Sequence, residues 1–153
     1  MKPRLEENQV ILFDLDGTLC DVAHRRRYVQ VEPKNWGAFS SALVLDEPLP
    51  HVKFVHDLFL YHEYRIVYCS GRSDEYETQT RTWLNEHLNV PHPDLRMRRA
   101  KDRRPDDVVK KEILDGILAD GLNPVFAFDD RTQVVDMWRA NGIPCFQVAP
   151  GDF

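Results

Sequence analysis

Short apolar runs alternate with amphipathic segments along this chain. The apolar runs are four to six residues long, which suits strands that are buried on both faces of a sheet. We predict five strands, over residues 9–14, 65–70, 94–99, 125–130 and 144–149. The run 94–99 alternates apolar and polar residues, which is typical of a weaker strand at the edge of a sheet.

Between these runs, apolar residues recur every three or four positions, as they do on one face of an amphipathic helix. The predicted helices span residues 49–64, 74–88, 106–120 and 131–141. Strands that alternate with helices favour an α/β fold. We therefore predict a doubly wound, Rossmann-like, mostly parallel five-stranded sheet with helices on both faces.

Composition and charge exclude several classes of protein. The net charge of -5 argues against general nucleic-acid affinity, so a polyanion would have to meet local basic patches such as residues 25–27 and 96–104. The three cysteines show no Cys-x-x-Cys spacing, which argues against a disulfide framework or a zinc cluster. The polar start of the chain and the lack of a long apolar run lead us to expect a cytoplasmic protein that does not enter a membrane.

Polar side chains follow three of the predicted strands where each strand ends. Asp14 and Asp16 follow the first strand, residues 70–72 follow the second, and Asp129 and Asp130 follow the fourth. In a parallel sheet these ends meet at one edge, which is where ligands bind. Side chains two apart in an extended backbone point the same way, so Asp14 and Asp16 should converge.

Carboxylates that meet at one edge repel each other unless a cation lies beside them. Mg²⁺ binds one or two carboxylates, a carbonyl, waters and phosphate oxygens. We therefore expect a Mg²⁺ site made by Asp14, the backbone carbonyl of Asp16, and Asp129 or Asp130. Lys110 lies one helical turn after Asp106, and helix spacing alone would make the two an ordinary surface ion pair.

These motifs together resemble a known superfamily. The order Asp14-Leu15-Asp16-Gly17-Thr18, Ser70-Gly71-Arg72, Lys110 and Asp129-Asp130 is similar to the haloacid dehalogenase (HAD) superfamily, across nearly the whole chain. Residues 104–110, 129–139 and 147–153 resemble, more narrowly, the phosphatase domain of phage polynucleotide kinase/phosphatases, which removes 3′-phosphates from nucleic acid ends. The sequence has no Gly-x-x-x-x-Gly-Lys-[Ser/Thr] stretch, so we expect phosphatase activity without kinase activity.

The resemblance implies a role for each matching residue. Asp14 would be the nucleophile that forms an aspartyl-phosphate, Asp16 the general acid and base, and Lys110 a cation that holds the phosphoryl group. Proximity to Asp14 would help to keep Asp16 protonated. The metal ligands would be Asp14, Asp16, Asp129 and Asp130, and the substrate-binding residues would be Thr18, Arg25, Ser70, Gly71, Arg72, Arg104 and Asp106.

The first half of the chain matches that branch less closely. About thirty residues separate the first strand from the next long helix, so we expect a single HAD-like domain over residues 1–153 in which residues 20–48 form a small helical cap. A small cap leaves the site open to a large substrate. Trp36 and Phe39 could stack on a base, but we expect them to form the core of the cap.

We therefore predict a Mg²⁺-dependent polynucleotide 3′-phosphatase that acts on nucleic acid ends. One alternative is a nucleotidase or small-molecule phosphatase with the same chemistry. A more remote one is a phospho-acceptor signalling domain, but its acceptor aspartate would end the third strand, where this chain has Arg98 and Arg99. Intact Asp14 and Asp16 argue against an inactive binding relative.

Overall fold

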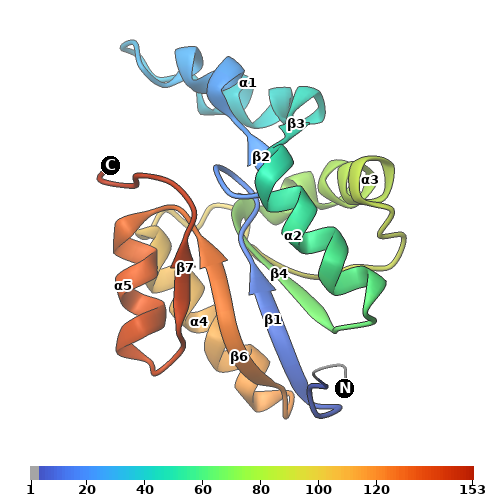
Figure 1. Ribbon diagram of the computed structural model, residues 1–153. Coiled ribbons are helices and arrows are strands. Elements are labelled where there is room, and N and C mark those ends of the chain that lie inside the picture. Colours follow the sequence, from blue (N-terminus) through green and yellow to red (C-terminus); the bar gives the residue numbers. More distant parts are fainter. Residues whose placement is uncertain (1–3) are drawn as a thin grey trace.

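A computed structural model describes residues 4–153 and has a parallel sheet at its centre. The five strands lie in the order β5-β4-β1-β6-β7, and every neighbouring pair is parallel (Figure 1). They are β1 (Gln9–Phe13), β4 (Ile66–Ser73), β5 (Asp94–Arg98), β6 (Asn123–Asp129) and β7 (Cys145–Gln147). The predicted α/β fold is confirmed, and the predicted edge strand is at an edge.

Helices cover both faces of the sheet. They are α2 (Pro50–Tyr61), α3 (Glu77–Leu88), α4 (Asp106–Ala119) and α5 (Thr132–Ala140). Successive residues of β1 point to opposite faces: Ile11 and Phe13 belong to the core under α2 and α3, whereas Val10 and Leu12 belong to the core under α4 and α5. The central strand is therefore buried on both sides, as its unbroken apolar run predicts.

Strand β4 runs further than predicted. It continues past Ser70 to Ser73, and its pairing with β5 shifts register between these two residues. A short 3-10 helix, η3 (Asp74–Tyr76), then leads into α3. Irregular pairing of this kind re-aims side chains at the end of a strand, and here it falls beside the polar residues 70–72.

A small second layer lies beyond the carboxyl ends of the strands (Figure 1). It contains β2 (Cys20–Asp21), η1 (Ala23–Tyr28), α1 (Trp36–Ser41), η2 (Ala42–Leu45) and β3 (Glu47–Pro48). Strands β2 and β3 pair antiparallel and form the stem that joins this layer to the sheet. We refer to residues 20–48 as the cap. Across residues 4–153, none of the helices is long and apolar enough to cross a membrane.

Candidate active site

Asp14 lies directly after β1, at the carboxyl edge of the sheet, and it is buried. One carboxylate oxygen accepts a hydrogen bond from the Thr18 hydroxyl at 2.8 Å, and the other accepts one from the Lys110 ammonium at 2.7 Å. Lys110 also donates to Asp129 at 2.8 Å. The structure therefore brings together residues from the end of β1, from β6 and from α4 that are far apart in the sequence.

Lys110 faces inward from α4 and is only 3% exposed. The surface pair with Asp106 that helix spacing suggested is replaced by these two contacts with buried carboxylates. Burial opposes a charged ammonium, but the attraction of Asp129 and Asp14 outweighs it and raises the pKa of Lys110 well above its usual value. Lys110 is therefore a fixed positive charge beside Asp14.

Asp14, Asp129 and Asp130 form the first acid cluster. Each offers a carboxylate oxygen, and these oxygens lie within 4.8 Å of one another. Burial, together with repulsion from Asp129, raises the pKa of Asp14 well above its usual value and also raises that of Asp130. Three carboxylates against one lysine leave a surplus of negative charge. Closely set oxygen donors with such a surplus fit a hard divalent cation.

Gly17 allows the first cluster to be so compact. It has a φ of +80°, and a Cβ atom added there would lie 2.2 Å from a carboxylate oxygen of Asp130. Any other residue would be strained and would push Asp130 away. The local structure therefore requires a glycine at this position of the Asp-x-Asp-Gly motif.

Asp16 belongs to a different group of charges. One of its oxygens accepts hydrogen bonds from Arg25 at 2.8 Å and from Arg72 at 2.8 and 2.6 Å. Burial would raise the pKa of Asp16, but the two guanidinium groups outweigh burial and lower it. The expectation that proximity to Asp14 keeps Asp16 protonated is therefore wrong for the free protein: the arginines hold it as a carboxylate.

Asp46, at the end of the cap, is the second acid of this group and is fully buried. It accepts from Arg25 at 2.8 and 2.7 Å and from Arg72 at 3.1 Å, so both arginines are shared between Asp16 and Asp46. His24 lies 2.7 Å from the same carboxylate. We call Asp16, Asp46, Arg25 and Arg72 the second acid cluster. The sequence interpretation missed Asp46; its only signal was an acid directly after the apolar run 43–45.

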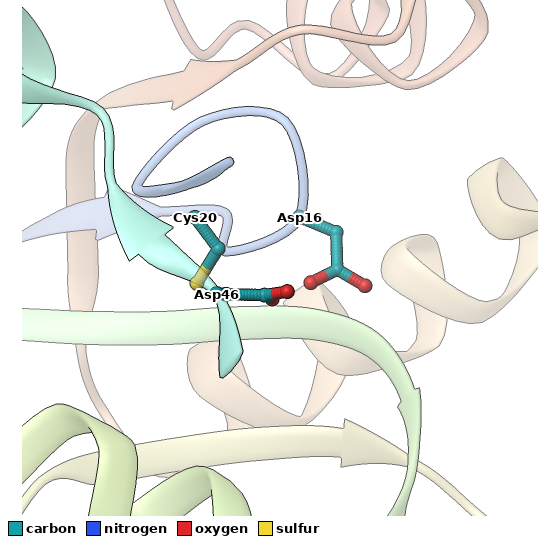
Figure 2. Close-up of side chains that lie close together, drawn as sticks. All are labelled: Asp16, Cys20 and Asp46. Atoms are coloured by element: carbon teal, nitrogen blue, oxygen red, sulfur yellow. The ribbon is translucent and has the colours of Figure 1, made fainter. Parts of the chain in front are cut away.

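Figure 2 shows Asp16 and Asp46 converging near Cys20. Acceptor atoms of these three residues also lie within 4.8 Å of one another. Here, however, two carboxylates face two arginines, and Arg72 also donates to the Cys20 sulfur at 3.4 Å. The charges balance without an ion. We therefore expect a metal ion to bind the first cluster and not the second. The Asp16 side chain belongs to the second cluster, so it is not placed among the expected metal ligands.

The last residues of β4, where its pairing with β5 shifts register, form a third polar group. The buried Ser70 hydroxyl accepts from the backbone N–H of Arg72 at 3.1 Å. Next to it, a Cβ on Gly71 would lie 2.8 Å from a carboxylate oxygen of Asp106, so the backbone and this carboxylate are in close contact. Asp106 pairs with Arg98 and, at 2.9 Å, with Arg131. Asp106 thus holds two basic side chains, neither of which was among the predicted site residues.

Arg104 is not brought together with the other predicted residues. Its side chain pairs with Asp102 and Glu112. It lines a cavity of ≈ 670 Å³ beside β5 and α4, and none of the predicted catalytic or metal residues lines this cavity. Arg96 and Arg98, from the same basic stretch, are also paired with carboxylates. Half of the six basic residues in 96–104 are thus neutralised by the fold.

Comparison with known proteins agrees with this geometry. Residues 8–153 match the family model described as the polynucleotide kinase PNKP phosphatase domain. The chain belongs to this family. It is a HAD-type phosphatase domain.

Two similar proteins are much longer than this chain. The chain is 31% identical, over 137 residues, to a protein of Autographa californica nuclear polyhedrosis virus that is named as a bifunctional polynucleotide kinase/RNA ligase; the match covers 89% of this chain and 18% of that protein. A chain in the structure of the Pnkp1/Rnl/Hen1 RNA repair complex is 32% identical, with a TM-score of 0.77, and the match covers 95% of this chain and 44% of that one. This chain therefore spans less than half the length of either relative.

A more distant structure shares the fold. The class C acid phosphatase from Bacillus anthracis, with tungstate bound, matches 97% of this chain and 68% of its own, with a TM-score of 0.67 and 19% identity. This supports the predicted HAD fold.

Proposed function

We propose that this domain is a Mg²⁺-dependent polynucleotide 3′-phosphatase that acts through an aspartyl-phosphate. The observation that carries the proposal is the division of the site into two acid clusters, because phosphoryl transfer to a carboxylate needs both a nucleophile and a proton carrier. The proposal gives Asp14 the first role and Asp16 the second. A site with only one of these functions would not need two carboxylates, two residues apart, whose negative charges are balanced by different cationic side chains.

In the first step, a carboxylate oxygen of Asp14 attacks phosphorus, and the bond between phosphorus and the sugar oxygen breaks. Lys110 and Thr18 hold Asp14, at 2.7 and 2.8 Å. Lys110 also supplies positive charge where the transferring group becomes crowded with negative oxygens. The leaving alkoxide takes a proton from Asp16. Water then attacks the aspartyl-phosphate, gives its proton to Asp16 and releases inorganic phosphate.

Asp16 must gain a proton before it can act as an acid. Arg25 and Arg72 favour its charged form in the free protein. A dianionic phosphate at the site adds negative charge beside Asp16 and so favours its protonated form once substrate is bound. Both arginines bind the same oxygen of Asp16, which leaves the other oxygen for the leaving group.

The first acid cluster would hold Mg²⁺ through Asp14, Asp129 and Asp130. When bound, the ion would offset charge on the phosphoryl oxygens and relieve the repulsion among the three carboxylates. Asp129 is itself fixed by the backbone N–H groups of Asp130 and Arg131 at 3.0 and 3.4 Å and by the Trp138 indole at 3.2 Å.

Three findings support a nucleic acid substrate. They are the family, the two relatives, whose names give a polynucleotide kinase/RNA ligase and an RNA repair complex, and the small cap. The deciding experiment compares kcat/KM for a 3′-phosphorylated oligonucleotide, a 3′-mononucleotide and a 5′-mononucleotide, each with Mg²⁺ and with EDTA. We expect the oligonucleotide to be the best substrate and EDTA to abolish turnover. A rate on the oligonucleotide no better than that on the 5′-mononucleotide would reject the polynucleotide assignment and favour a nucleotidase.

A further inference from the structure

The cap presents one large aromatic side chain to solvent. Trp36 begins α1 and is 59% exposed, so it does not form the core of the cap as its type suggested. The two other tryptophans, Trp83 and Trp138, are 1% exposed, and their indole N–H groups donate to the backbone carbonyl of Asp46 and to the carboxylate of Asp129. Two tryptophans therefore support the acid clusters from inside, and the third is left on the surface of the cap.

Trp36 is linked to the second acid cluster by a short series of contacts. Its ring packs against Phe39 in a T-shaped pair, with 5.8 Å between the ring centroids. The Phe39 ring lies 4.4 Å from the guanidinium carbon of Arg25, which also donates to the Phe39 carbonyl at 3.3 Å. Arg25 in turn contacts Asp16 at 2.8 Å. The exposed ring thus lies three contacts from the proposed proton carrier, on the layer above the carboxyl edge of the sheet (Figure 1).

One basic side chain lies near the Trp36 ring, and further basic residues precede it in the cap sequence. The Lys34 ammonium lies 6.0 Å from the centre of the Trp36 ring. Residues 22–36 contain four lysines and arginines and one acid, although the whole chain is acidic; one of the four, Arg25, is buried and paired with Asp16 and Asp46. Arg26 and Arg27 of this stretch are exposed. An aromatic face with basic side chains around it is the arrangement that binds single-stranded nucleic acid, because bases stack on the ring and phosphates pair with the cations.

We propose that Trp36 is the stacking platform for a nucleobase at or next to the 3′-phosphate end of the substrate. This inference rests on the proposed function and adds to it a base-binding subsite on the cap. Because every base has a flat π face, the subsite would accept all four bases with little preference. Stacking of this kind is worth about fivefold to 150-fold in affinity.

The test compares wild type with Trp36→Ala, Trp36→Phe and Tyr61→Ala. Tyr61 is a matched control, since it is also an exposed aromatic side chain (78%) but lies at the end of α2, away from the cap. The readout is the ratio of kcat/KM for a 3′-phosphorylated oligonucleotide to kcat/KM for p-nitrophenyl phosphate, which has neither a base nor a strand. We expect Trp36→Ala to lower this ratio by about tenfold or more, mainly through KM. Trp36→Phe should keep part of it, and Tyr61→Ala should leave it unchanged.

A binding measurement separates stacking from other effects. In an Asp14→Asn background, an oligonucleotide with 2-aminopurine at its 3′ end should show quenched fluorescence on binding, and Trp36→Ala should remove the quenching. If Trp36→Ala leaves both the ratio and the quenching intact, the subsite is wrong, even where wild type prefers the oligonucleotide. A change in oligomeric state without a change in the ratio would also overturn it and make Trp36 a protein contact. A wild type that does not prefer the oligonucleotide rejects the proposed function itself.

Discussion

The two acid clusters at the carboxyl edge of the sheet contain the same residue type and differ in how their charge is compensated. In the first, Lys110 pairs with Asp14 and Asp129, and Asp130 adds a third carboxylate beside them. In the second, Asp16 and Asp46 share two arginines. The pKa of Asp14 is raised, by burial and by its acidic neighbours, whereas that of Asp16 is lowered by the arginines despite burial. Two aspartates separated by a single residue are thus in opposite electrostatic environments.

This difference shows how a short motif can supply two functions. The surplus negative charge of the first cluster favours a cation, and with it an ionised nucleophile. The second cluster is already neutral, and Asp16 is fixed by charge-assisted hydrogen bonds from two arginines, which suits a group that must keep its position while it gains and loses a proton. We expect variants in the two clusters to differ in the kind of defect as well as in its size.

The largest expected effect is the loss of the nucleophile. Asp14→Asn should lower kcat by about 10⁴-fold or more, since an amide oxygen cannot form the aspartyl-phosphate. The measurement is phosphate release at saturating substrate, with Asp115→Asn, an exposed aspartate of α4, as the control for a lost surface charge. Substantial turnover by Asp14→Asn would show that water attacks phosphorus directly.

Asp46→Asn should be the most damaging change in the second cluster for stability. It would leave two buried arginines without their shared carboxylate, and removal of one partner from a buried ion pair costs about 3–5 kcal/mol. Urea unfolding would measure this loss. Leu43→Ala, in the same part of the cap and 1% exposed, would show what a cavity alone costs. Equal stability of Asp46→Asn and wild type would mean that Asp46 does not hold the arginines.

Smaller stability effects of opposite sign should separate the two clusters in EDTA at pH 7. A raised pKa means that the negative charge of Asp14 destabilises the folded state at any pH above the pKa of Asp14 in the unfolded chain. Asp14→Asn removes this charge, so the variant should be more stable than wild type by about 1 kcal/mol, or ~2–4 °C in Tm. The lowered pKa of Asp16 means that its charge is favourable above the unfolded pKa and that this benefit is lost as pH falls through the folded value. Asp16→Asn should therefore destabilise by about 1 kcal/mol. Thermal unfolding would detect both, and shifts of the same sign would contradict the comparison.

The smallest effect is expected for Arg104. Its side chain is exposed and already paired with Asp102 and Glu112, outside both clusters. Arg104→Ala should change stability by less than about 1 kcal/mol and kcat/KM by less than about threefold. A tenfold rise in KM for the oligonucleotide, with no change for p-nitrophenyl phosphate, would restore the predicted role of Arg104 in substrate binding.

The sheet and the first cluster could be predicted from the sequence because their signals are local. Buried parallel strands have continuous apolar runs, and polar residues at their ends must meet at one edge, so Asp14 and Asp129 could be placed together from the pattern alone. The inward direction of Lys110 could not be: helix spacing alone favoured a surface pair with Asp106, and only the family resemblance indicated a catalytic role.

The second cluster was harder to predict because its contacts join distant residues in short elements. Asp46 lies 21 residues from Arg25 and 26 from Arg72, and the cap has no long hydrophobic period that would fix its packing. The state of Asp16 therefore could not be deduced from its closeness to Asp14. The exposure of Trp36 was missed for a similar reason, since residue type alone favours burial.

The most direct test of this division is the leaving-group dependence of Asp16→Asn. With p-nitrophenyl phosphate, whose leaving group needs little help from an acid, we expect Asp16→Asn to retain formation of the aspartyl-phosphate, visible as a burst of p-nitrophenol. With a 3′-phosphorylated oligonucleotide, whose sugar oxygen must be protonated, turnover should fall by about 10²–10⁴-fold. Asp129→Asn, in the first cluster, should slow the first step with both substrates. Equal losses on the two substrates for Asp16→Asn would contradict the account.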